Sequence, residues 1–193
     1  TLRARYPGSG GNVEVTFRAK LGEDVLAGEP VDPADPAGAK IPVLRGARNY
    51  ETVWISASGS PLSSPPGHGT LYWAEQVFDT TTNRETWRFH PEHGGGVLDL
   101  TALDADTDSV RILTASAEVT YPSRRIRRTS VWENLGLHPK HENSLSIVFG
   151  AELRRRQQRL EVPIVCDDDG LTGPQIARVI FGQAIRCDKN HRN

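Results

Sequence analysis

The sequence predicts a mostly-β single domain, either a β-barrel or a β-sandwich, with one C-terminal α-helix. Three observations predict this fold class. Short runs alternate apolar and polar residues, Gly, Pro, Asn and Asp are frequent between those runs, and one stretch near the end of the chain has helical spacing. The 193 residues are enough for one domain with one hydrophobic core. We therefore expect a single domain over residues 1–193.

The expected strands carry apolar residues at every second position, as a half-buried strand requires. Val13, Val15 and Phe17 alternate in this way with Glu14 and Thr16. A hairpin is expected around the turn at 104–109, between apolar residues near 97–100 and a strand at 110–121. Similar patterns predict further strands at 50–56, 71–78, 85–89, 145–149 and 160–165.

Two stretches rich in chain-breaking residues are expected to form loops. Residues 28–42 contain four prolines, which remove hydrogen-bond donors from a sheet and restrict the residues before them. Residues 57–69 are dominated by Ser, Pro and Gly. The polar tail at 188–193 is expected to be frayed.

One helix is expected near the C-terminus. Thr172 can cap it, and Pro174 occupies an early position where a missing N–H costs nothing. Ile176, Val179 and Ile180 then recur at helical spacing. Packing of this helix against the sheet is a better interpretation than half of a helix-turn-helix, since no second helix is predicted beside it.

Composition favours a cytoplasmic protein that does not associate with membranes. No run approaches the ~20 apolar residues that cross a bilayer. The two cysteines, Cys166 and Cys187, are too few for a disulfide-stapled secreted domain, although one bridge between them stays open as an alternative.

Charge is distributed unevenly along the chain. Residues 1–110 carry 9 basic and 15 acidic side chains, whereas residues 111–193 carry 14 basic and 9 acidic ones. Such a split is typical of a protein with a polyanion-binding face, and it can also let two halves of one fold attract each other.

Arginines cluster in two segments of the basic half. The planar guanidinium donates two parallel hydrogen bonds, a geometry that suits phosphate, and a nearby aromatic ring can stack on bases. The alternative is a solvated edge strand whose charges prevent intermolecular sheet pairing. The predicted nucleic-acid-binding residues are Arg124, Arg125, Arg127, Arg128, Trp132, Arg154, Arg155, Arg156 and Arg159.

A His-Pro-X-His tetrapeptide occurs twice, at 90–93 and 138–141. Imidazole is a common ligand of zinc and other transition metals, and a metal-bound water would support hydrolysis. The alternative is that His-Pro marks the start of two loops with solvated rings. The candidate metal ligands are His90, His93, His138 and His141.

These features favour a binding module, without a cofactor, that engages a polyanion such as nucleic acid. Two alternatives stay open: a metal-dependent hydrolase, possibly a nuclease, with zinc or a similar divalent ion, and a structural protein such as a coat or tail component. The acidic stretch at 104–108 is interpreted as a hairpin turn, because the residues that would complete a calcium loop are missing. The sequence decides neither whether the chain is an enzyme nor its oligomeric state.

Overall fold

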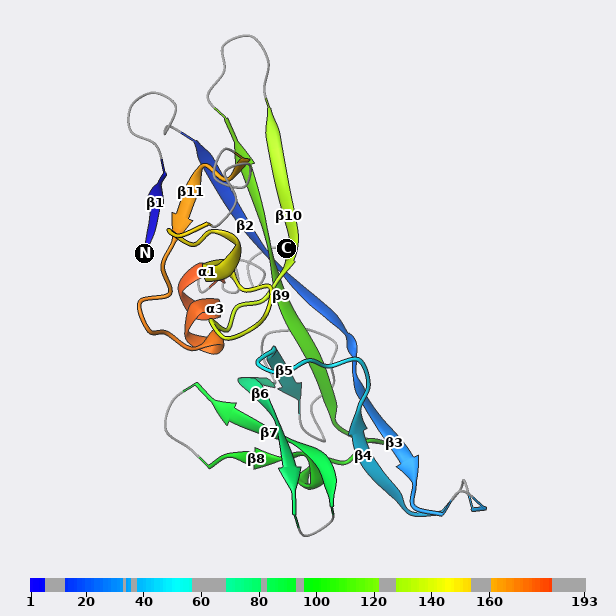
Figure 1. Ribbon diagram of the computed structural model, residues 1–193. Helices are drawn as coiled ribbons and strands as arrows, with labels where there is room; N and C mark the ends of the chain where they lie inside the picture. The colour runs from blue at the N-terminus through cyan, green and yellow to red at the C-terminus, as the bar shows by residue number, and fades with distance from the viewer. Residues whose placement is uncertain are drawn as a thin grey trace. The chain divides into compact units, whose positions relative to one another are not determined.

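The computed structural model describes residues 1–5, 13–32, 34–35, 38–56, 69–80, 83–92, 96–121, 128–153 and 161–181. Strands account for 52% of the structure and helices for 12%, which confirms the mostly-β prediction (Figure 1). The strands form several open sheets, and no closed barrel is found among the described residues. No helix within these ranges is long and apolar enough to span a bilayer.

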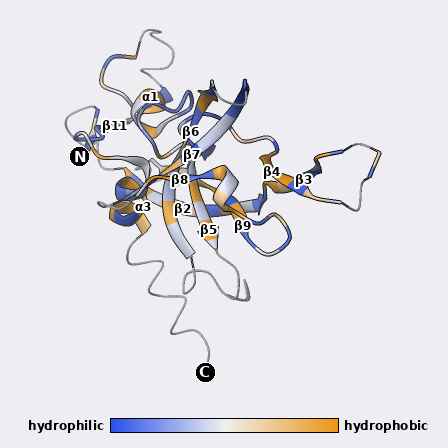
Figure 2. Ribbon diagram, turned by 90° about the horizontal axis from the view of Figure 1, so that it is seen from below, coloured by the Kyte–Doolittle hydropathy of each residue, from blue (hydrophilic) through white to orange (hydrophobic). Residues whose placement is uncertain are grey.

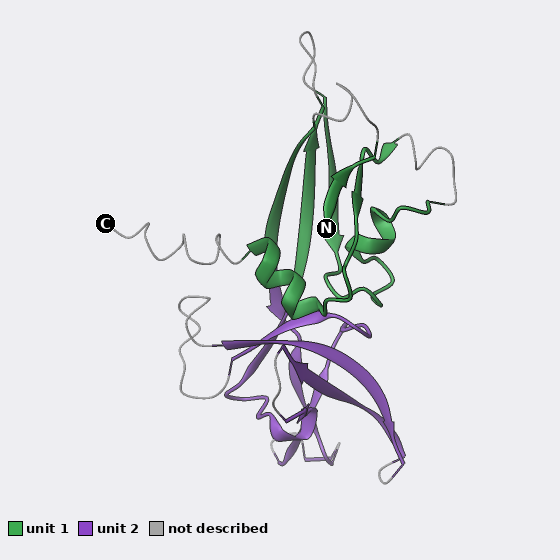
Figure 3. Cartoon of the chain, turned by 90° about the vertical axis from the view of Figure 1, so that its left-hand side faces the viewer, with its two compact units in different colours: residues 1–20, 114–193 green, residues 21–113 purple. Residues whose placement is uncertain are grey.

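The chain divides into two compact units (Figure 3). Unit 1 comprises residues 1–20 and 114–193, and unit 2 comprises residues 21–113. Strands β2 (Glu14–Asp24) and β9 (Ser109–Thr120) each contribute residues to both units. Both strands run without a break across the boundary between the units. The division is therefore compatible with the predicted single domain and does not test it.

Unit 2 is built on an antiparallel sheet in which the first residues of β9, from Ser109 to Ile112, pair with β5 (Thr52–Ser56). Pairing continues from β5 to β6, β7 and β8 in that order. Hydrophilic and hydrophobic residues mix along the strands (Figure 2), as expected for a sheet with one buried face. The remaining strands of this sheet are β6 (Gly69–Asp79), β7 (Arg84–Pro91) and β8 (Leu98–Asp99).

The core of unit 2 lies on one face of this sheet. Val53 and Ile55 of β5 are buried there, as their alternation predicts, and so are Trp87 and Phe89 of β7. The 3-10 helix η2 (Leu100–Ala102) adds Leu100 to the same cluster. These side chains exclude water from one face, so the register of the strands is well specified.

The predicted loop at 28–42 is shorter in the structure. Strands β3 (Leu26–Pro30) and β4 (Lys40–Leu44) take its two ends and pair as an antiparallel ribbon. Pro42 lies inside this ribbon opposite Gly28. A strand that pairs on one side only leaves the N–H groups of the other side without a ladder partner, so a proline is tolerated there. The other predicted loop falls almost wholly on residues 57–68, outside the described part, and the tail at 188–193 also lies outside it.

The predicted hairpin around residues 104–109 is wrong in its pairing. Strand β8, which precedes the turn, pairs with β7 at Arg88 and Phe89 instead of with β9. Strand β9 follows the turn and pairs with β5. The turn itself is confirmed as a turn by Asp104, whose carboxylate accepts the N–H of Asp106 at 2.9 Å.

Unit 1 contains β9 from Thr114 onward, which pairs with β10 (Thr129–Leu135). It also contains a separate two-stranded sheet. That sheet joins β1 (Leu2–Ala4) to β11 (Ile164–Cys166), so the predicted late strand is confirmed only in its last residues. Helix α3 (Gly173–Phe181) confirms the predicted helix. Its first turn is stabilised by the Gln175 side chain, which accepts the Thr172 N–H at 2.9 Å.

The strand predicted at 145–149 is wrong, because residues Leu145–Val148 form the single-turn helix α1. The Ser144 hydroxyl caps it and accepts the N–H of Ile147 at 3.2 Å. Leu145 and Phe149 are both buried, while Ile147 is 53% exposed. Positions i and i+4 share one face of a helix as well as one face of a strand, so only the middle residue distinguishes the two.

Candidate polyanion-binding site

The first arginine segment, residues 124–128, lies between β9 and β10 along the chain. Thr129 pairs with Thr120, and the Tyr121 N–H donates to the Arg128 carbonyl oxygen at 2.9 Å, so the two strands stay paired up to both ends of residues 122–127. Arg128 is therefore placed by regular strand pairing. Three of the predicted phosphate-binding residues, Arg124, Arg125 and Arg127, lie outside the described residues.

The second arginine segment is residues 154–159. The side chain of Arg5 joins the stretches of chain on its two sides. Arg154, Arg155, Arg156 and Arg159 lie outside the described residues, but the chain on both sides of them is described. The guanidinium of Arg5 donates to four carbonyl oxygens, two from each flank. These are the oxygens of Gly150 at 2.7 Å, Ala151 at 3.1 Å, Val162 at 2.8 Å and Ile164 at 3.3 Å.

Tyr121 connects the ends of the two segments. Its hydroxyl donates to the carbonyl oxygen of Glu161 at 2.9 Å, and Glu161 is the first described residue after the second segment. Its ring also lies under the guanidinium of Arg128, with 5.3 Å between Cζ and the ring centroid, a cation–π distance. The described residue that precedes one segment therefore contacts the described residue that follows the other.

Trp132 is held by the core of unit 1 on one side. Its ring meets that of Phe149 edge to face, with 5.3 Å between the centroids and 78° between the planes. Phe149 is fully buried, whereas Trp132 is half-buried. Only the remaining surface of the indole is accessible, so the predicted stacking role of Trp132 stays a prediction with a smaller face than the sequence suggests.

The two units differ in charge more sharply than the two halves of the sequence. Unit 1 contains 17 basic and 10 acidic residues, and unit 2 contains 6 basic and 14 acidic ones. Eight of the basic residues of unit 1 are the arginines of the two segments. Unit 1 therefore carries a net charge of +7 and unit 2 a net charge of −8.

The second His-Pro-X-His segment forms a compact turn in which the two histidines are buried. His138 and His141 are each 6% exposed. The Lys140 N–H donates to Nδ1 of His138 at 3.2 Å, and the Asn143 N–H donates to Nδ1 of His141 at 3.1 Å. Since an amide can only donate, both Nδ1 atoms are unprotonated, and their lone pairs are already used within the turn.

His90 of the first segment has different surroundings. Its ring stacks on that of Trp73, with 3.9 Å between the centroids and 9° between the planes. Its Nε2 lies 2.8 Å from Oε2 of Glu75, which follows Trp73 by two residues on β6. His90 is thus positioned by β6 and β7 in unit 2, while His138 and His141 belong to unit 1.

A metal site at the four histidines stays a prediction. Within the described part of the chain, no group of three or more His, Cys, Asp or Glu side chains could hold a metal ion. His93 lies outside the described residues. Metal analysis of the purified protein tests the hypothesis, because a zinc site would give a stoichiometric ion that is lost when His93 and His141 are replaced.

The sequence did not predict the roles of Arg5 and Gly136, which make hydrogen bonds that join separate stretches of unit 1. Arg5 is one of several arginines near the start of the chain, and its carbonyl partners are at least 145 residues away, so no local pattern marks it. Gly136 follows a strand without the turn signal of Asn-Gly or Asp-Gly.

Comparison with protein-family models, with characterised proteins and with solved structures finds no match to this chain.

Proposed function

We propose that this protein is a binding module that engages a polyanion, with nucleic acid as its ligand, through the two arginine segments of unit 1. The observation that carries the proposal is the pair of contacts made by Tyr121, with Arg128 at the end of one segment and with Glu161 at the end of the other. The described residues at one end of each segment therefore contact each other, and along the chain each of the eight arginines lies two to seven residues from Tyr121 or Glu161.

Arginine in this number suits phosphates better than it suits a structural role. Each guanidinium can donate two parallel hydrogen bonds to one phosphate, and the charge releases condensed counterions from the nucleic acid. Arg5 illustrates the structural alternative, since its donors are satisfied by carbonyl oxygens. The net charge of +7 on unit 1 supports long-range attraction of the same ligand.

The test is a salt titration of binding to a fluorescent 20-nucleotide DNA, single-stranded and duplex. If four to six arginines contact phosphates, log K should fall against log salt with a slope between about −3 and −5. Affinity should then drop roughly 60- to 1,000-fold between 50 and 200 mM salt. A flat titration, or no binding to either DNA at low salt, would contradict the proposal.

A matched pair of double variants locates the contacts. Replacing Arg124 and Arg127 by Gln should weaken binding and reduce the magnitude of the salt slope by about 1.4–1.8, because each lost phosphate contact removes roughly 0.7–0.9. Replacing Arg45 and Arg84 by Gln removes the same charge from exposed positions of unit 2. This control should keep the wild-type slope. Equal losses in the two variants would assign binding to net charge alone.

A further inference from the structure

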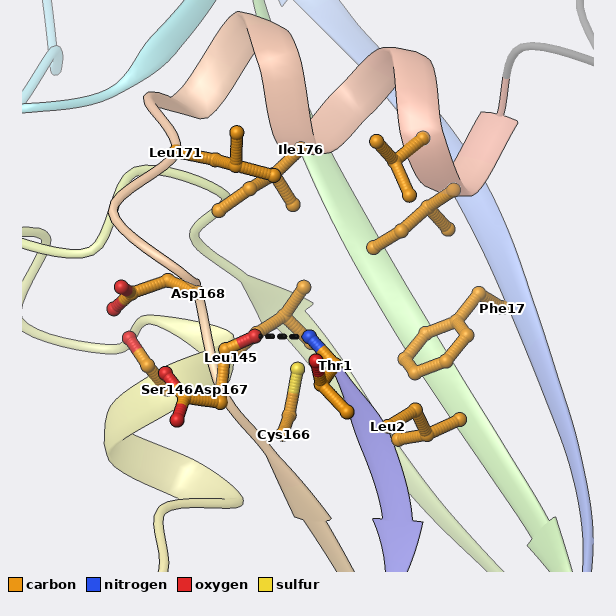
Figure 4. A pocket seen from close by; sticks show the side chains of 12 residues that line it. Thr1, Leu2, Phe17, Leu145, Ser146, Cys166, Asp167, Asp168, Leu171 and Ile176 are labelled. Carbon is orange, nitrogen blue, oxygen red and sulfur yellow. Dashed lines mark hydrogen bonds between the residues drawn. The ribbon is translucent and has the colours of Figure 1, made fainter.

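Unit 1 contains an apolar cavity of about 150 Å³ beside helix α3 (Figure 4). Its walls come from β1, β2, α1, β11 and α3, and they include Leu2, Phe17, Leu145 and Ile176. Leu145 and Ile176 are 2% and 8% exposed and form the closed side. Leu2 and Val179 also line the cavity, yet they are 45% and 75% exposed, so it reaches the surface between β1 and α3.

The thiol of Cys166 lies in the wall of the cavity. Cys166 forms no disulfide within the described residues, and Figure 4 shows its sulfur directed toward helix α3. Cys187 lies outside the described residues, so the alternative of a bridge between the two is not tested. Burial raises the pKa of this thiol, the N-terminal ammonium of Thr1 offsets part of the rise, and the carboxylates of Asp167 and Asp168 add to it, so that the pKa is raised on balance. The thiol is therefore neutral near pH 7 and behaves as a small apolar group.

One edge of the cavity carries charge of both signs, with negative charge in excess. The N-terminal ammonium of Thr1 lies there and is paired with the carboxylate of Asp169. Asp167 and Asp168 lie there together with Ser146 (Figure 4). Oδ1 of Asp167 accepts the Asp169 N–H at 3.2 Å, and Oδ1 of Asp168 accepts the Gly170 N–H at 3.0 Å. These hydrogen bonds hold both carboxylates in place at the edge, so a bound molecule would meet an apolar interior and an anionic rim.

We propose that this cavity binds a small apolar molecule of about the size of a substituted benzene ring, with a neutral or cationic end toward Asp167 and Asp168. An enclosed apolar cavity of about 150 Å³ lined by Leu, Ile and Phe accepts benzene, so the volume found here is large enough for one ring. The carboxylates attract an amine and repel an anion of the same shape. This site is independent of the arginine segments, and its occupant is not a polyanion.

Three compounds with one ring separate the contributions: benzylamine, benzyl alcohol and benzoate, titrated by calorimetry against the full chain carrying Cys187→Ser. Benzylamine and benzyl alcohol should bind saturably, and benzoate should bind at least tenfold more weakly than benzylamine. Both ligands should also slow alkylation of Cys166 by iodoacetamide at pH 8 at least tenfold. Absence of saturable binding by both would overturn the proposal.

Two kinds of variant place the ligand. Cys166→Leu fills the cavity and should weaken benzyl alcohol at least tenfold, and Val179→Trp at the exposed mouth should do the same if Cys166→Leu does not fold. Asp168→Asn keeps the oxygen that accepts the Gly170 N–H. It should reduce the preference for benzylamine over benzoate at least threefold and leave benzyl alcohol unchanged. Wild-type affinities in the cavity-filling variants would show that the compounds bind elsewhere and would overturn the assignment.

Discussion

Replacing Gly136 by Ala should lower the free energy of unfolding by about 3 kcal/mol, at the upper end of the cost of overpacking a buried site. A Cβ atom at this position would stand 2.2 Å from Nδ1 and 2.5 Å from Cγ of His141. Neither partner can retreat easily. The Gly136 N–H donates to the Asn143 carbonyl oxygen at 2.8 Å, and the Gly136 carbonyl oxygen accepts the Leu145 N–H at 3.1 Å.

Urea unfolding followed by circular dichroism measures this effect, with Gly96→Ala as the control. Among the described residues, no atom other than those of the adjoining residues lies within 4 Å of a Cβ added at Gly96, so this variant should stay within about 0.5 kcal/mol of wild type. The double variant Gly136→Ala, His141→Ala removes the ring that the new methyl group meets. Its cost should be at least about 1 kcal/mol less than the sum of the two single costs. Additive costs would contradict the steric explanation.

The positions of several strands could be predicted, because alternation reports which face of a strand is buried, whereas β3, β4 and β10 were not predicted. Val53 and Ile55 are buried as expected, and so are Trp87 and Phe89. The partners of the strands could not be predicted in the same way, since a strand with a buried face fits any neighbour of matching register. Strand β8 accordingly pairs with β7 rather than across the turn with β9.

The proposed binding site shows the same division between local and distant information. The arginine clusters are visible in the sequence because charge density needs no knowledge of the fold. What joins their ends is not visible, since the Tyr121 hydroxyl finds its acceptor 40 residues along the chain. Arg5 is separated from Val162 by 157 residues. Such contacts are set by the paths of β1, β9 and β11 and leave no periodic trace.

Replacing Arg5 by Met should cost about 2–4 kcal/mol of stability, because several carbonyl oxygens lose charged donors at once and are left partly buried. The methionine side chain keeps much of the apolar part of arginine but has no hydrogen-bond donor. Hydrogen exchange of the Cys166 N–H, which donates to the Phe149 carbonyl oxygen at 2.9 Å, should accelerate as the two flanks separate. Urea unfolding gives the energy, and exchange monitored by NMR gives the location.

Two further substitutions distinguish the hydrogen bonds of Arg5 from its charge. Arg3 lies exposed on β1, two residues earlier, so Arg3→Met should change stability by less than about 0.5 kcal/mol. Arg5→Lys keeps the charge but cannot reach carbonyl oxygens on both flanks with one ammonium, so it should recover less than half of the loss. Full recovery by lysine would mean that charge alone matters there. If instead the several hydrogen bonds of the guanidinium are required, Arg5→Met should also weaken DNA binding, because Arg5 fixes the residues that flank the second arginine segment. The salt slope should not change, because in the proposed site Arg5 contacts no phosphate.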